Sequence, residues 1–146
     1  MRALLDTNVI VDVLQRREPW YDAGSKIFIA IANKQVTGCI TAKEVADIHF
    51  FARKQFRGQE NVDEKARQVL SKLLAPFEVV DTLATDCHDA MGIPNNDYED
   101  ALMIASAQRS DVDCIVTRNC EHYRGSFVKI FTPEQFLDVM QMRTEE

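Results

Sequence analysis

Short apolar runs alternate along the chain with longer amphipathic segments. The short runs have the length of buried strands, and the longer ones repeat apolar residues every three or four positions, as core-facing helices do. This alternation is typical of an α/β fold with a mostly parallel sheet flanked by helices. We expect about five strands, at residues 3–5, 36–40, 77–80, 114–117 and 128–131.

Helices are expected to connect these strands. In the segment 20–32, the stripe of Trp20, Ala23, Ile27 and Ile31 predicts a helix that packs on the core. Pro76 stops a later helix, since proline cannot continue a helical backbone. The full set of expected helices covers residues 8–15, 20–32, 41–56, 62–74, 85–91 and 97–109, with a last helix from 133 onward.

Three helix starts have the pattern of a capping box, a small polar residue followed three positions later by Glu or Gln. The pattern occurs at Thr41 with Glu44, at Asn96 with Glu99, and over residues 132–135, where a proline takes the first helical position. These pairs predict where the third, sixth and last helices begin.

Composition agrees with one globular domain over residues 1–146. The chain has 46% hydrophobic and 27% charged residues, and no apolar run approaches the roughly 18 residues of a membrane span. An acid already at position 6 argues against a secretory signal, so we expect a cytoplasmic protein without a membrane partner. The formal net charge of −6 argues against a protein that coats nucleic acid, but not against a nucleic-acid enzyme.

Several acids lie where expected strands end or where the following helices begin. Asp6 follows the first strand, Glu44 follows the second, and Asp97 and Asp100 open the helix before the fourth. In an open parallel sheet, ligands bind beyond the carboxyl ends of the strands, so these side chains are expected at a common edge. Thr117 follows the fourth strand and reaches the same edge.

Each acid also has a local explanation. Asp6 could cap the next helix, Glu44 could serve only the capping box, and Asp97 and Asp100 could face a helix dipole. If instead the acids share one site, their mutual repulsion must be relieved by protons or by a cation. Carboxylate oxygens suit Mg²⁺ or Mn²⁺, so the sequence predicts a divalent-metal site.

Five motifs in order along nearly the whole chain resemble those of the PIN-domain nucleases. They lie at residues 4–10, 41–45, 97–102, 114–119 and 131–136. The resemblance implies a single PIN-like domain with Asp6, Glu44 and Asp100 as the metal-site acids. Asp97 takes the position of an additional acid that some members carry.

One position departs from the family pattern. Members often have a further acid before an aromatic residue after the fourth strand, and here His122 precedes Tyr123. A second metal position is therefore in doubt. Thr7, Asn8, Thr117 and Asn119 are expected to support the acids or to contact substrate, together with His122.

The resemblance further implies a Mg²⁺- or Mn²⁺-dependent endoribonuclease that cleaves single-stranded RNA. Hydrolysis without the ribose 2′-hydroxyl would leave a 5′-phosphate. Many small stand-alone members are toxins of the VapBC type, which implies an antitoxin partner and a homodimer. Basic residues that could guide RNA to the acids are Arg16, Arg17, Arg53, Lys54 and Arg57.

Two other functions compete with this hypothesis. A catalytically weakened PIN-like domain could act as a protein- or RNA-binding module, and the His122 departure favours it. A phosphatase could use Asp6 as a phosphorylated nucleophile, although haloacid-dehalogenase-like enzymes need a second Asp where this chain has Asn8.

Overall fold

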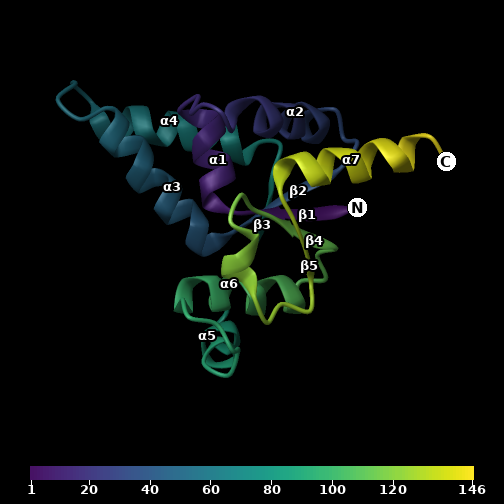
Figure 1. Ribbon diagram of the computed structural model, residues 1–146. Helices are drawn as coiled ribbons and strands as arrows, with labels where there is room; N and C mark the ends of the chain where they lie inside the picture. Colours follow the sequence, from purple (N-terminus) through teal and green to yellow (C-terminus); the bar gives the residue numbers. More distant parts are fainter.

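The computed structural model describes residues 1–146 and contains one five-stranded sheet (Figure 1). All neighbouring strands are parallel, in the order β3-β2-β1-β4-β5, which confirms the predicted α/β class. The strands are β1 (Arg2–Leu5), β2 (Thr37–Thr41), β3 (Glu78–Val80), β4 (Cys114–Val116) and β5 (Lys129–Phe131). The first strand of the chain is thus the middle strand of the sheet.

Seven α-helices and one short 3₁₀-helix surround the sheet. They are α1 (Thr7–Leu14), α2 (Tyr21–Ala32), α3 (Ala42–Gln55), α4 (Val62–Leu74), α5 (Ala84–Ala90), α6 (Tyr98–Arg109), η1 (Cys120–Tyr123) and α7 (Pro133–Thr144). The bounds of the seven α-helices agree with the predicted segments to within a few residues, whereas η1 was not predicted. None of them has the length and apolar character that a membrane span requires.

The helices cover the two faces of the sheet unequally. Successive side chains of a strand point to opposite faces, so Ala3 and Leu5 join one core cluster and Leu4 joins another. The larger cluster includes side chains of α1, α2, α3, α4 and α7, and the smaller one packs against α6 and η1. Figure 1 shows the same division, with α5 lying against α6 on the second face.

Local sequence explains where several helices begin. Thr41 and Glu44 form the predicted capping box of α3, and Thr132 and Gln135 form that of α7. The box predicted at Asn96 is wrong. Asp97 caps α6 instead, because its side chain accepts hydrogen bonds from the backbone N–H groups of the first helical turn.

Trp20 is a second correction. The apolar stripe predicted that it faces the core, but α2 begins one residue later and the Trp20 side chain is 36% exposed. The indole lies instead beneath the guanidinium of Arg118. The other members of the stripe, Ala23, Ile27 and Ile31, are buried as predicted.

Candidate metal-binding site

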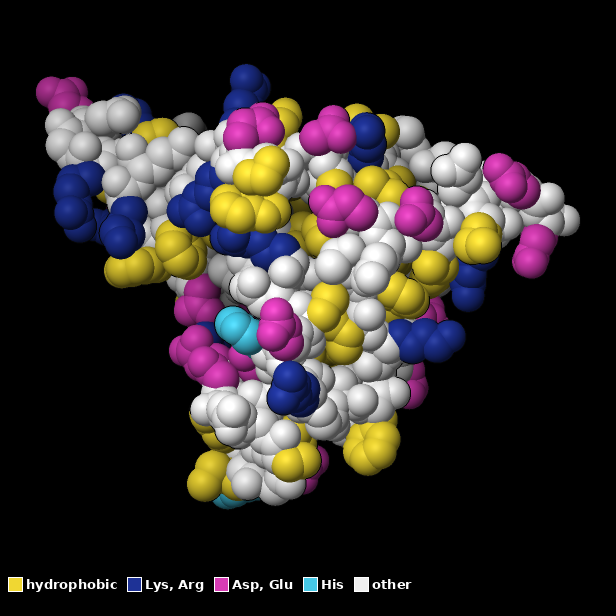
Figure 2. Space-filling model, in the orientation of Figure 1, with side chains coloured by type: hydrophobic (Ala, Val, Ile, Leu, Met, Phe, Trp, Pro, Cys, Tyr) yellow, Lys and Arg dark blue, Asp and Glu magenta, His cyan; other side chains and the backbone are white.

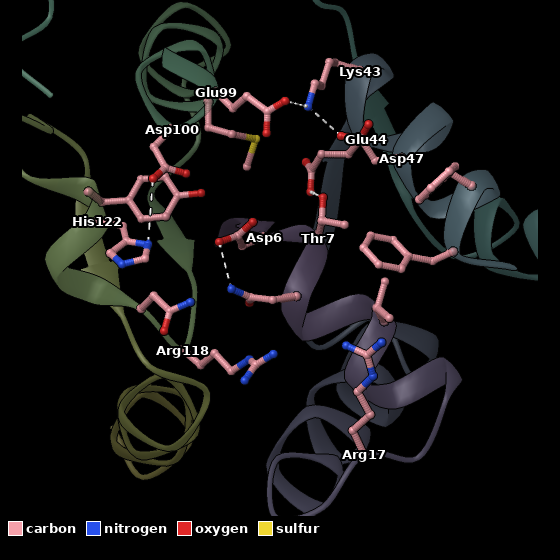
Figure 3. Close-up of a pocket in the computed structure, with 17 residues that line it drawn as sticks. Asp6, Thr7, Arg17, Lys43, Glu44, Asp47, Glu99, Asp100, Arg118 and His122 are labelled. Carbon is pink, nitrogen blue, oxygen red and sulfur yellow. Dashed lines mark hydrogen bonds and ion pairs between the residues drawn. The ribbon is translucent and has the colours of Figure 1, made fainter. Parts of the chain in front are cut away.

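Three predicted acids line one cavity at the carboxyl edge of the central strands. Asp6 follows β1, Glu44 lies in the first turn of α3 after β2, and Asp100 lies in the first turn of α6. The cavity has a volume of about 420 Å³, and all three side chains contribute to its wall (Figure 3). Three segments far apart in sequence therefore meet as the topology requires.

Glu44 combines both roles considered from the sequence. Its Oε1 accepts a hydrogen bond from the Thr41 N–H at 2.9 Å, which closes the capping box. Its Oε2 accepts from the Thr7 hydroxyl at 3.1 Å. The side chain is 2% exposed, and burial together with the charge of Asp6 raises its pKa to about 8. The capping box thus holds a carboxylate inside the acidic cavity.

Asp6 is held by neutral donors from two segments. Its Oδ2 accepts hydrogen bonds from the Thr117 hydroxyl at 2.8 Å and from the Asn8 amide at 3.3 Å. The Thr117 hydroxyl in turn accepts from the Asn119 N–H at 3.1 Å. Burial raises the pKa of Asp6, although the hydrogen bond from Thr117 opposes the rise. The predicted supporting residues Thr7, Asn8 and Thr117 therefore contact the acids directly.

Asp100 and Asp97 differ in their surroundings. Burial and the charges of Asp97 and Asp6 raise the pKa of Asp100 to about 6. Asp97 caps α6 and opens onto an adjoining hollow rather than the cavity itself. His122 lines both spaces, and its Nδ1 lies 3.9 Å from Oδ2 of Asp100. Asp97, the expected additional acid, therefore lies outside the cavity that holds Asp6, Glu44 and Asp100, and His122 lies between the two spaces.

The donor chemistry of the cavity fits a hard divalent cation. No Lys or Arg forms an ion pair with Asp6, Glu44 or Asp100, since Lys43 at the rim pairs with Asp47 and Glu99. Buried carboxylates without a basic partner are costly unless protons or a cation neutralise them. No three His, Cys, Asp or Glu side chains are gathered closely enough to form a complete metal site by themselves.

The sequence did not predict the contacts that several further residues make in or beside this cavity. Tyr123 is 2% exposed and lines the cavity, and its hydroxyl lies near the three acids without a well-aligned hydrogen bond. Arg118 also lines it and pairs with Asp12, a buried acid of α1. The signal for Asp12 was present, since it is an acid inside the apolar run Val9–Leu14. Its partner could not be identified without the fold.

Solved structures share this fold at low sequence identity. FitAB bound to an IR36 DNA fragment matches with a TM-score of 0.68 and 19% identity, covering 90% of this chain and 94% of that one. VapBC from Salmonella typhimurium, bound to DNA, gives 0.64 and 17%, covering 91% and 98%. A toxin-antitoxin complex from Klebsiella pneumoniae gives 0.63 and 19%, covering 90% and 97%.

The sequence itself identifies the family. No curated protein matches the chain. The family model described as PIN domain matches residues 2–121, which include all three acids of the cavity and the β4 motif. The chain therefore belongs to the PIN-domain family.

Proposed function

We propose that this protein is a divalent-metal-dependent nuclease that hydrolyses phosphodiester bonds of single-stranded RNA. The observation that carries the proposal is the convergence of Asp6, Glu44 and Asp100, from three separate segments, in one cavity where none of them pairs with Lys or Arg. Burial raises the pKa of each of the three acids, so neutralisation by a proton or by a cation would be favoured there. Membership of the PIN-domain family supports the same chemistry.

The residues of the cavity have distinct parts in this mechanism. Mg²⁺ or Mn²⁺, held by Asp6 and Asp100 with Glu44 beside them, would polarise the scissile phosphate and lower the pKa of the attacking water. Thr117 and Asn8 orient the Asp6 carboxylate, and Thr7 orients that of Glu44. Such fixed neighbours keep the acids in place as charge develops. The product would carry a 5′-phosphate.

The structural neighbours support a toxin that is controlled by a second protein. One neighbour is itself described as a toxin-antitoxin complex, and VapBC was solved bound to DNA. From these we propose that this chain is the toxin of such a pair, with an antitoxin as partner. A homodimer is part of the same proposal, and Phe50, which is 58% exposed, offers apolar surface for it.

A cleavage assay tests the nuclease proposal. The full chain is incubated with a structured RNA and Mn²⁺ beside Asp6→Asn, and beside Asp81→Asn as a matched control. Asp81 is an exposed acid that follows β3 at the same sheet edge and does not line the cavity. Wild type and Asp81→Asn should cleave, and Asp6→Asn should not. Equal cleavage by all three proteins would show that the activity does not come from this cavity.

One observation favours a second function, a catalytically weakened domain that binds protein or RNA. His122 stands beside Asp100 where many members carry an acid, and the carboxylates do not form a closed set of ligands. Titration of the full chain with Mn²⁺ by calorimetry separates the two. A nuclease should bind Mn²⁺ and lose that binding in Asp6→Asn. A weakened module should give no heat of binding that depends on Asp6.

A further inference from the structure

A buried acid holds two arginines at the wall of the acidic cavity. Asp12 in α1 is 1% exposed, and neither of its carboxylate oxygens accepts a well-aligned hydrogen bond. Its only charged neighbours are Arg118, with Nε 3.1 Å from Oδ2, and Arg17, with Nη1 3.9 Å from Oδ1. The two arginines come from different segments, so Asp12 is the point at which they meet.

Both guanidinium groups are fixed by further contacts. The guanidinium of Arg118 lies 3.9 Å from the centre of the Trp20 ring, within the range of a cation–π interaction. Arg17 donates two hydrogen bonds to the Gln15 side-chain oxygen, at 3.1 and 2.7 Å, and lies 5.9 Å from the centre of the Phe51 ring. Neither arginine is therefore a freely moving surface side chain.

The stability of the fold does not explain Asp12. Burying a carboxylate costs several kcal/mol, roughly, and an apolar side chain of similar volume usually costs less even when the charge is paired. Asp12 lies among apolar residues of α1 and gains no hydrogen bond in return. Its effect is instead to aim Arg118 and Arg17, whose side chains stay 24% and 38% exposed.

The arginines lie on one side of the cavity and the acids on the other. Figure 3 shows the Arg118 and Arg17 guanidinium groups together below Asp6, with Glu44 and Asp100 opposite. Two guanidinium charges against one carboxylate leave this side positive. On the face of the molecule drawn in Figure 2, Lys and Arg side chains gather above a group of acidic ones.

We propose that Arg118 and Arg17 form a phosphate-binding subsite for a nucleic-acid strand whose neighbouring phosphodiester lies at the acids. The inference rests on the proposed nuclease function. A guanidinium carries five N–H donors and can bind a phosphate through two of them, so contact with Asp12 leaves donors free. Asp12 and Trp20 are positioning residues, because they act through Arg118.

This subsite would offset the repulsion between the acidic cavity and a phosphate group. Carboxylates repel the phosphate that they must cleave, and a fixed pair of guanidinium groups would hold the strand in register at the next phosphate. Positioning by groups remote from the cut bond is a large part of catalysis. The phosphodiester backbone is the ligand, so the subsite should be indifferent to base sequence.

Strand binding without turnover tests the subsite. A fluorescent single-stranded RNA is titrated with the full chain in EDTA, as wild type, Arg118→Gln and Arg143→Gln. Arg143 is an exposed arginine of α7 that does not line the cavity and supplies the same charge change. Arg118→Gln should bind about tenfold more weakly, the effect of one charge-assisted contact. Its plot of log affinity against log salt should be flatter by about 0.7.

Asp12→Asn gives a test of opposite sign. Removing a negative charge beside two arginines should strengthen RNA binding if only net charge matters. If Asp12 positions Arg118, binding should weaken several-fold and the salt slope should flatten. Arg118→Lys keeps the charge but loses the planar fork and the stacking on Trp20, so it should also bind more weakly. Thermal unfolding checks that each variant is folded. If Asp12→Asn does not fold, Arg118→Lys still tests the subsite, because Arg118 is partly exposed and its substitution disturbs the core less.

The outcomes separate the subsite from the nuclease proposal. Equal RNA affinity of wild type and Arg118→Gln overturns the subsite, and so does an equal loss in Arg143→Gln. Tighter binding by Asp12→Asn overturns the positioning role. The nuclease proposal fails separately, if Asp6→Asn cleaves as wild type does, and that result leaves the EDTA binding measurements valid.

Discussion

The hydroxyl of Thr117 donates a hydrogen bond to Oδ2 of Asp6 at 2.8 Å, across 111 positions of sequence. This contact joins the ends of β1 and β4, and Thr117 is fully buried. It leaves the other oxygen of Asp6 available to a ligand. The orientation of one acid of the cavity therefore depends on a neutral side chain from a distant strand.

Thr117→Val should lower the affinity for Mn²⁺ about tenfold, as loss of an orienting hydrogen bond usually does. The substitution keeps the volume but removes the donor to Asp6. Calorimetric titration measures the affinity. Thr37→Val is the control, because Thr37 begins β2 at the edge of the sheet away from the cavity. Unchanged affinity in Thr117→Val would show that the hydrogen bond does not orient a ligand.

Stability of the metal-free protein should fall as the pH rises from about 5 to about 8. The pKa of Glu44 is raised from its ordinary 4.5 to about 8, chiefly by burial, so in this range the folded state holds a proton that the unfolded state has lost. Deprotonation then leaves a buried charge. Urea unfolding across this range should show the fall in wild type and a flatter profile in Glu44→Gln. If the free energy of unfolding changed with pH equally in wild type and Glu44→Gln, the pH dependence would come from groups other than Glu44.

Tyr123→Phe should leave the free energy of unfolding unchanged or raise it by about 1 kcal/mol. The Tyr123 hydroxyl is buried near the Asp6 carboxylate without a well-aligned hydrogen bond, and a poorly satisfied polar group costs stability. Tyr98→Phe is the contrast, because the Tyr98 hydroxyl donates to the Cys87 carbonyl at 2.8 Å. Chemical denaturation measures both. A clear loss in Tyr123→Phe would mean that the hydroxyl is hydrogen-bonded in solution.

Arg109→Met should destabilise the fold by about 3 kcal/mol. Arg109 donates to both carboxylate oxygens of Asp86, at 2.7 and 3.0 Å, and the Asp86 side chain is fully buried. Removal of the Arg109 guanidinium leaves the buried Asp86 carboxylate without a basic partner. Arg67→Met breaks a 2.6 Å pair with Asp63 on the surface, where solvent screens the charges, and should cost much less. Similar losses in the two variants would contradict the importance of burial.

The sequence predicted the elements well because their signals are local. Apolar periodicity and capping residues depend on neighbours within a few positions, and the bounds of α4 match the predicted segment 62–74. The place of the acids followed from one general rule about parallel sheets. The order of the strands did not follow from periodicity, since all five strands are short and none has a pattern that identifies its neighbour.

One missed feature depends on partners distant in sequence, and two others concern the residue at which a helix begins. Asp12 meets Arg118 only because β4 lies beside β1, and no local pattern reports that pairing. Trp20 was assigned to the core because its spacing fits the stripe, but α2 starts after it. Asp97 replaced Asn96 as the cap, since two neighbouring polar residues fit the same signal.

The central place of β1 has a consequence for the order of folding. This strand is made first, yet its second neighbour, β4, begins only at Cys114. A growing chain that has reached α6 already carries all three acids but lacks Thr117, Arg118 and the strand that completes the edge. Contacts between such distant segments form slowly. The cavity can therefore form only after β4 has been synthesised and has paired with β1.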